Sequence, residues 1–288
     1  MSRTVYVNGR YVAEADATVS LFDRGFLFAD GIYEVTAVID GQMVDNDLHL
    51  ARLRRSLNEV SIPLPVSEHA IVEIQTELIA RNGLREGVVY LQVTRGAADR
   101  NFDFAHDIVP TFIAFTQSKN IVDPPALRNG IAVATMPDSR WARRDIKSTM
   151  LLAQILAKKS AKEGGFQEAW FTEDGYVTEG ASSTAYIVTK DDVVITRPNS
   201  RAVLPGCTKR SVLKLAGEGG LRVEERLFTV DEAFNANEAF LTSASSLVTP
   251  IIRIDDRIIG TGKPGPLTSR LLTMYLDMAR RGAASETD

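Results

Sequence analysis

Residues 140–165 read RWARRDIKSTMLLAQILAKKSAKEGG, and residues 174–184 read DGYVTEGASST. Apolar residues recur at helical spacing over 149–163, and the two glycines that follow end the pattern. Ser148 is therefore expected to cap a helix N-terminus, with Lys147 just outside it. The positive end of a helix and two neighbouring arginines would disfavour the protonated amine. A neutral lysine attacks carbonyl groups, so Lys147 is a candidate Schiff-base residue.

The composition is that of an ordinary globular protein, with 288 residues, 44% hydrophobic and 24% charged. The net charge of −4 and the lack of a long basic cluster argue against nucleic acid or an anionic membrane as a partner. No stretch approaches the roughly 20 apolar residues that span a bilayer, and the N-terminus lacks an apolar signal core. We therefore expect a cytoplasmic protein that acts on small molecules.

The number and spacing of the cysteine and histidine residues do not predict a metal site. Cys207 is the only cysteine, which excludes an internal disulfide and a cysteine zinc cluster. The three histidines, His49, His69 and His106, share no ligand spacing.

The order of secondary-structure signals predicts two α+β domains. An Asn-Gly pair inside the alternating residues 5–12 favours an opening hairpin. Residues 119–129 include Asp-Pro-Pro and show no periodicity, so we interpret them as a linker. They would join a smaller α+β domain, residues 1–118, to a larger one, residues 130–288.

Glu179 stands out as the acid in the middle of the second quoted stretch. One predicted helix and one predicted hairpin fill the 32 positions between it and Lys147. Chain geometry therefore permits a sheet to bring both side chains to one edge.

Several segments of this chain resemble the fold type IV pyridoxal 5′-phosphate (PLP) enzymes, and among them the D-amino acid aminotransferases. The resemblance covers essentially the whole chain. The matching segments are SLFDRGFLFADGIYEVTAV (20–38), HLARLRRS (49–56), DIKSTMLLAQILAK (145–158) with VTEGASST (177–184), and VLPGCTKRSV (203–212).

The resemblance implies a role for each matched residue. Lys147 would hold PLP as a Schiff base and move the proton between substrate and cofactor, while Glu179 would keep the pyridine nitrogen protonated. The phosphate would be met by Arg52 and by the helix start at Cys207 and Thr208. The other implied cofactor ligands are Leu204, Ser243 and Ala244, and the implied substrate ligands are Tyr33, Arg100, Ser182, Ser183 and Ser245.

The stretch VYLQVTRGAADRNF (89–102) bears on the substrate. It resembles the segment in which D-amino acid aminotransferases place an arginine and, two residues later, a histidine against the substrate carboxylate. Arg100 stands in the arginine position, but Phe102 replaces the histidine. Asn101 or His106 could substitute for it. The replacement makes room for apolar groups, as in relatives that transaminate (R)-configured amines.

The activity implied is transfer of an amino group from a D-amino acid, such as D-alanine, to 2-oxoglutarate or pyruvate by a ping-pong mechanism. The alternatives are an (R)-selective amine transaminase, a branched-chain aminotransferase, an aminodeoxychorismate lyase, and a PLP-binding protein without catalysis. The resemblance also implies a homodimer.

Overall fold

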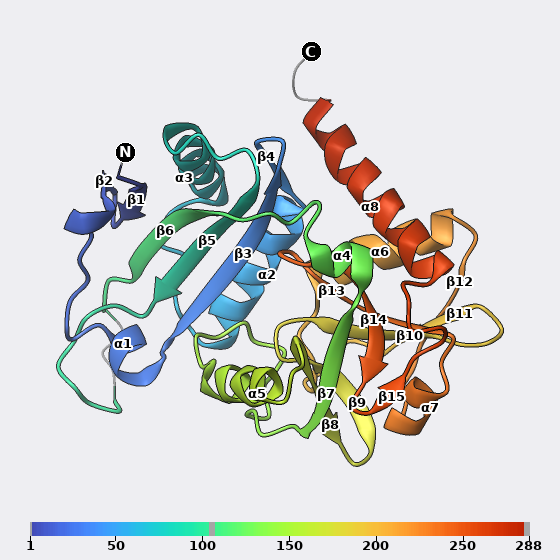
Figure 1. Cartoon of the computed structure of the whole chain (residues 1–288). Coiled ribbons are helices and arrows are strands. Elements are labelled where there is room, and N and C mark those ends of the chain that lie inside the picture. Colours follow the sequence, from blue (N-terminus) through green and yellow to red (C-terminus); the bar gives the residue numbers. More distant parts are fainter. Residues whose placement is uncertain (1, 104–106, 285–288) are drawn as a thin grey trace. The chain divides into compact units, whose positions relative to one another are not determined.

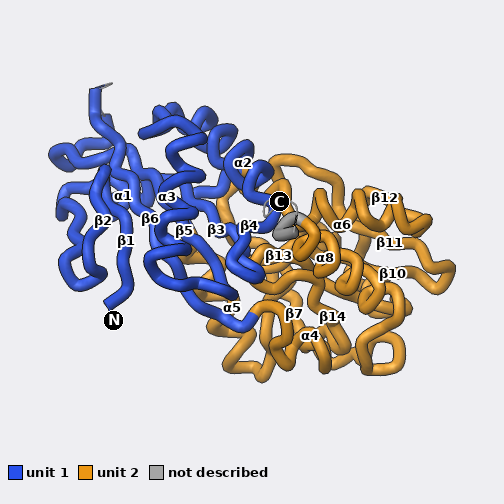
Figure 2. The backbone as a smooth tube through the Cα atoms, turned by 90° about the horizontal axis from the view of Figure 1, so that it is seen from above, with its two compact units in different colours: residues 1–120, 146–150, 285–288 blue, residues 121–145, 151–284 orange. Residues whose placement is uncertain are grey.

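The computed structural model describes residues 2–103 and 107–284 and divides into two compact units (Figure 2). Unit 1 contains the described residues up to 120 and the segment 146–150, and unit 2 contains residues 121–145 and 151–284. His106, considered above as a substrate ligand, lies outside the described residues.

The first change of unit falls after Asn120, inside the segment interpreted as a linker. Part of that segment is regular structure, because helix α4 (Pro125–Asn129) begins directly after Pro124. A proline at the first helical position loses no hydrogen bond and already has helical φ, which explains why the Pro-Pro pair starts a helix here.

Unit 1 is built on a six-stranded antiparallel sheet in the order β2-β1-β6-β5-β3-β4 (Figure 1). Its strands are β1 (Thr4–Val7), β2 (Arg10–Ala13), β3 (Gly31–Ile39), β4 (Gln42–Val44), β5 (Gly87–Thr94) and β6 (Thr111–Ser118). Its helices are the 3-10 turn η1 (Glu14–Asp16), α1 (Arg24–Phe28), α2 (Asn46–Glu59) and α3 (Glu68–Arg81).

The opening hairpin of unit 1 is confirmed. Asn8 and Gly9 both have positive φ, 45° and 88°, as a two-residue hairpin turn requires. Helix α2 packs on β3 with Leu50, Leu53 and Leu57 buried, and α3 packs against β1 and β6. The sheet that carries Tyr33 is thus fixed by a packed helix layer.

Unit 2 contains a mixed nine-stranded sheet. The order is β12-β11-β10-β13-β14-β7-β8-β9, with β15 paired to β14 (Figure 1). The strands are β7 (Ile131–Pro137), β8 (Glu168–Glu173), β9 (Tyr176–Gly180), β10 (Thr184–Val188), β11 (Val193–Thr196), β12 (Arg222–Glu225), β13 (Glu238–Ser243), β14 (Leu247–Ile254) and β15 (Arg257–Ile258). The other helices are α5 (Leu152–Glu163), α6 (Cys207–Glu218), α7 (Val230–Phe234) and α8 (Pro266–Ala284). Trp170, Phe228 and Leu241 belong to its apolar core.

The predicted helix start at Ser148 is wrong. Helix α5 begins at Leu152, and residues 146–150 run beside β3 in unit 1. The Tyr33 N–H donates to the Lys147 carbonyl at 3.0 Å, and the Thr149 N–H donates to the Gly31 carbonyl at 3.0 Å. These hydrogen bonds to the sheet override the local helical pattern. The expected influence of a helix terminus on Lys147 is therefore also wrong.

Among the described residues, no helix combines the length and the apolar character needed to cross a membrane.

Candidate active site

Lys147 is held against β3 in unit 1. Its carbonyl accepts from Tyr33, and its own N–H donates to Ser56 Oγ of α2 at 3.4 Å. The amine Nζ lies 4.1 Å from the centroid of the Tyr33 ring. Tyr33 in turn stacks on Tyr90, with ring centroids 5.7 Å apart. The sheet therefore brings together two of the predicted site residues, Lys147 and Tyr33, on a rigid base.

Arg52 forms a buried ion pair with Glu34 in unit 1. Its Nε and Nη2 donate to the two carboxylate oxygens of Glu34, each at 2.8 Å, and His49 Nδ1 lies 2.8 Å from Glu34 Oε2. Burial by itself raises the pKa of Glu34, but Arg52 and His49 outweigh burial and hold that pKa well below its usual range. Glu34 thus fixes the plane of the guanidinium that the sequence assigned to a phosphate.

Arg100 lies on the exposed loop after β5. Its guanidinium carbon is 5.4 Å from the Phe28 ring centroid and 5.7 Å from that of Phe102, which is itself 78% exposed. The backbone of the loop is held where Arg24 Nη1 donates to the Asn101 carbonyl at 2.6 Å. Phe102 therefore presents an apolar ring beside Arg100.

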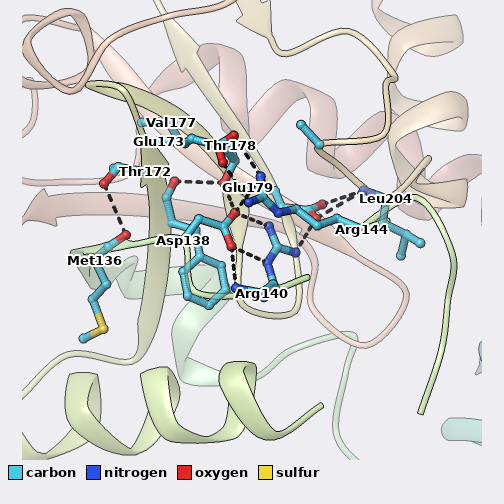
Figure 3. A network of polar contacts seen from close by, with 12 residues as sticks. Met136, Asp138, Arg140, Arg144, Thr172, Glu173, Val177, Thr178, Glu179 and Leu204 are labelled. Carbon is cyan, nitrogen blue, oxygen red and sulfur yellow. Dashed lines mark hydrogen bonds and ion pairs between the residues drawn. The ribbon is translucent and has the colours of Figure 1, made fainter. Parts of the chain in front are cut away.

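Glu179 is buried on β9 of unit 2 and accepts from two sides (Figure 3). Arg140 Nη1 donates to Oε1 at 2.5 Å, and the Leu204 N–H lies 3.2 Å from Oε1 and 3.1 Å from Oε2. Burial raises the pKa of Glu179, although Arg140 and the Leu204 N–H act against this effect. The carboxylate is thus ordered but retains an affinity for a proton.

Arg140 is shared between Glu179 and a second acid, Asp138, in the loop after β7. Its Nε and Nη2 donate to the two Asp138 oxygens at 2.9 and 2.7 Å. The guanidinium also covers the Phe171 ring, 4.6 Å from its centroid. Arg140 therefore has a defined position before any ligand is considered.

The N-terminus of α6 lies next in the chain after Leu204. Gly206 occupies the cap position and no side chain caps the helix, while Cys207 and Thr208 in the first turn are buried. A side chain at Gly206 would meet Thr184 Oγ1 at 2.9 Å, so this helix start lies close to β10. Because uncapped N–H groups at a helix start bind anions, the predicted phosphate position has suitable donors.

The predicted serine ligands fall into two groups. Ser182 Oγ donates to the buried Glu168 at 2.9 Å, and Ser183 Oγ lies 3.4 Å from the same oxygen. Ser243 ends β13, and the half-buried Ala244 and Ser245 belong to the turn before β14. The first pair thus already has an internal partner. Substrate binding stays a prediction for Ser182, Ser183 and Ser245, and cofactor binding stays a prediction for Ser243 and Ala244.

Sequence reasoning missed four polar residues of these two networks. Glu34 lies within the mainly apolar strand GIYEVTAVI, where a charged residue signals a buried partner, and Thr178 lies in β9. Asp138 and Arg140 directly follow strand β7. No local signal in the sequence says which acid Arg140 meets.

Residues 31–254 match the family model for amino-transferase class IV. The chain is 40% identical over 269 residues to the D-alanine aminotransferase of Bacillus licheniformis, which covers 93% of this chain and 94% of that protein. It is 38% identical over 270 residues, with the same coverage, to the D-alanine aminotransferase of Staphylococcus aureus (strain MSSA476).

Two solved structures share the fold. The branched-chain amino acid aminotransferase of Escherichia coli superposes with a TM-score of 0.90 at 22% identity, covering 97% of this chain and 95% of that one. The branched-chain amino acid aminotransferase of Thermoproteus uzoniensis, solved with norvaline, gives a TM-score of 0.87 at 24% identity, covering 97% and 95%. The predicted α+β fold of type IV is therefore confirmed.

Proposed function

Because the chain belongs to the class IV aminotransferases, we propose that it transfers the amino group of a D-amino acid, such as D-alanine, to 2-oxoglutarate or pyruvate. The observation that carries this proposal is the position of Lys147, whose backbone is bonded to β3 and whose amine lies over the Tyr33 ring. The 40% identity to a D-alanine aminotransferase over 93% of the chain supports a D-amino acid as the donor.

The residues present fit PLP as the cofactor. A lysine amine suits its aldehyde, the ordered carboxylate of Glu179 suits its pyridine nitrogen, and the uncapped start of α6 suits its phosphate. When bound, PLP supplies an aldehyde carbon that accepts the amino group and a ring that takes up the electrons of the Cα–H bond.

Lys147 would act twice, as the covalent anchor of the cofactor and as the base that moves a proton to and from the substrate Cα. Tyr33 limits the space of the amine from one side. Glu179 would hold a proton at the pyridine nitrogen, since a carboxylate beside that nitrogen favours its charged form. Arg52, Thr208 and the Cys207 N–H would bind the phosphate, and Leu204 would contact the ring.

Substrate recognition would rest on Arg100, whose guanidinium would bind the substrate carboxylate with two parallel hydrogen bonds. The substitution of Phe102 for a second donor gives specific support to a second candidate activity, (R)-selective amine transamination. The Arg100 guanidinium lies beside two apolar rings, those of Phe28 and Phe102. A substrate amine that has no carboxylate would then lose little binding energy beside Arg100.

A donor screen tests the proposal. D-alanine, D-glutamate, L-leucine and (R)-1-phenylethylamine are each supplied with pyruvate or 2-oxoglutarate, and D-alanine should turn over fastest with 2-oxoglutarate. Lys147→Ala should lower this rate by about 1,000-fold or more, whereas Lys214→Ala, an exposed lysine of α6, should not change it. A protein that stays colourless with PLP would disprove the activity.

The screen also separates the rivals. If (R)-1-phenylethylamine exceeds D-alanine and Arg100→Ala leaves the D-alanine rate unchanged, the second candidate is correct. Fastest turnover of L-leucine would indicate a branched-chain aminotransferase, and pyruvate release without an acceptor would indicate a lyase.

We also propose that the chain forms a homodimer. The supporting feature is an apolar face on α5, where Leu152, Ile155 and Leu156 are 68%, 59% and 56% exposed. Contiguous apolar side chains of this kind mark association surfaces. Light scattering should give the dimer mass for the wild type and for Ser160→Glu on the same helix, and a lower mass for Ile155→Glu. An unchanged mass for Ile155→Glu would exclude this face.

A further inference from the structure

In the polar network around Glu179, the guanidinium of Arg140 is shared between two acids, Asp138 and Glu179 (Figure 3). Arg140 gives two of its nitrogens to Asp138 and only Nη1 to Glu179. The side chains of Arg140 and Glu179 are each 6% exposed, and that of Asp138 is fully buried. Loss of one partner at this place would therefore leave a buried charge poorly compensated.

Asp138 is itself held from several elements. Its Oδ2 accepts from Thr178 Oγ1 of β9 at 2.8 Å, and Arg144 Nη1 lies 3.4 Å from the same oxygen. Arg144 also binds Glu173 of β8 through both Nη atoms, at 3.0 and 2.9 Å. Asp138 is thus a fixed anchor for Arg140, and the network continues to the end of the neighbouring strand.

The pKa values of the two acids, Asp138 and Glu179, are shifted in opposite directions. Burial raises the pKa of Asp138, but Arg140, Thr178 and Arg144 more than offset burial, so that pKa lies below its usual value. Glu179 has fewer donors, and burial keeps its pKa above the usual value. The other charged groups whose field reaches this site are Glu173 and Arg197. The network therefore leaves Glu179 as the acid with the greater affinity for a proton.

We propose that Arg140, fixed by Asp138, is the positioning residue of Glu179. Arg140 orients the Glu179 carboxylate by one hydrogen bond. Because Asp138 binds the other two nitrogens of Arg140, the arginine does not fully neutralise Glu179. Glu179 can then hold a proton on a cationic ring nitrogen. The inference rests on the proposed function only for the identity of that nitrogen. Arg140 does not touch the reacting atoms in this scheme, since it acts through Glu179.

The first test uses the protein without cofactor. The carboxyl infrared band that is lost in Glu179→Gln reports the protonation of this side chain. The titration of the band should move to higher pH in Arg140→Met, which removes the positive partner, and to lower pH in Asp138→Asn, which leaves Arg140 to Glu179 alone. An identical titration in wild type and both variants would overturn the inference, whatever reaction the protein catalyses.

The second test uses the protein loaded with PLP and measures kcat, KM and the rate of PLP release. In Arg140→Met, kcat should fall by about 100-fold and PLP release should accelerate about 10-fold, while the donor KM stays within about threefold. Arg140→Lys, which keeps the charge but loses the fork, should recover part of kcat. The matched control is Arg143→Met in the same loop, whose arginine pairs with Asp145, and it should resemble the wild type.

Equal effects of Arg140→Met and Arg143→Met on kcat and PLP release would overturn the positioning role. If Arg140→Met does not fold, Asp138→Asn and Arg140→Lys carry both tests. A wild type that neither binds PLP nor transaminates would disprove the proposed function, and the titration without cofactor would still decide the inference.

Discussion

Both units hold a candidate site residue in a buried arginine–carboxylate pair, and the two pairs are built in opposite senses. In unit 1, Glu34 takes two nitrogens of Arg52 and a contact from His49. In unit 2, Glu179 takes only one nitrogen of Arg140, because Asp138 takes the other two. The pKa of Glu34 is consequently lowered, and that of Glu179 is raised. Burial raises the pKa of both acids, so the direction of the shift depends on how far the neighbouring charges and hydrogen-bond donors offset burial.

This difference matches the roles proposed for the two pairs. In unit 1 the arginine is the group that would meet a ligand, so its acid partner has only to stay ionised and hold it. In unit 2 the acid would meet a ligand, so its arginine partner must not satisfy it completely. A buried ion pair can therefore either fix a cation or keep an anion reactive.

The largest expected effect on stability is that of Glu34→Gln. It replaces the carboxylate that binds the buried Arg52 with a neutral amide and should lower the free energy of unfolding by about 3 kcal/mol at pH 7. Urea unfolding measures this loss. Arg54→Gln on the same helix breaks only an exposed pair with Glu68 and should cost no more than about 0.5 kcal/mol. Equal losses in both variants would show that the Glu34 pair is not special.

Glu179→Gln should act mainly on turnover. We expect kcat to fall by about 100-fold, because a neutral amide does not stabilise a proton on the pyridine nitrogen. Stability should fall less than in Glu34→Gln, since Arg140 keeps its two bonds to Asp138. Steady-state kinetics and urea unfolding of the same preparation check both parts. A large loss of stability with unchanged kcat would reverse the comparison.

The two acids should also give opposite dependences on pH in the protein without cofactor. The folded pKa of Glu34 is lowered, so its stabilising contribution is complete above the unfolded value of about 4.3 and is lost as pH falls. The folded pKa of Glu179 is raised, so its contribution is complete below about 4.3 and is lost as pH rises.

Unfolding of wild type, Glu34→Gln and Glu179→Gln at several pH values between 3 and 8 measures these slopes. The margin of the wild type over Glu34→Gln should shrink toward acid. Its margin over Glu179→Gln should shrink toward neutral pH. Slopes of the same sign would contradict the assignment of one of the two pairs.

A smaller effect is expected from Thr178→Val, which removes a donor to Asp138. The hydrogen bond to a charged group should contribute about 1.5 kcal/mol to stability, and kcat should change by less than about threefold. Thr172→Val, which removes a 3.2 Å bond to the neutral Met136 carbonyl, should cost about 0.5 kcal/mol. Thermal unfolding ranks the two, and a greater loss in Thr172→Val would argue against a charged Asp138.

Much of the fold could be predicted from local signals. The Asn8–Gly9 turn, for example, depends only on residues close in the chain. Residues 146–150 could not be placed in this way, because their hydrogen bonds go to β3, more than 100 positions away. The sequence pattern described a helix there, and the sheet pairing replaced it.

The amino-acid sequence by itself determined the order of strands and helices, the family to which the chain belongs, and the residue types of the candidate site, with Lys147 and Glu179 first among them. Only the tertiary structure decided that Lys147 lies in an extended segment over Tyr33, and that Arg140 divides its bonds between Asp138 and Glu179. The physical reason is that turns, caps and periodicity are properties of neighbouring residues. The partner of a buried charge is chosen by strands that are adjacent in space.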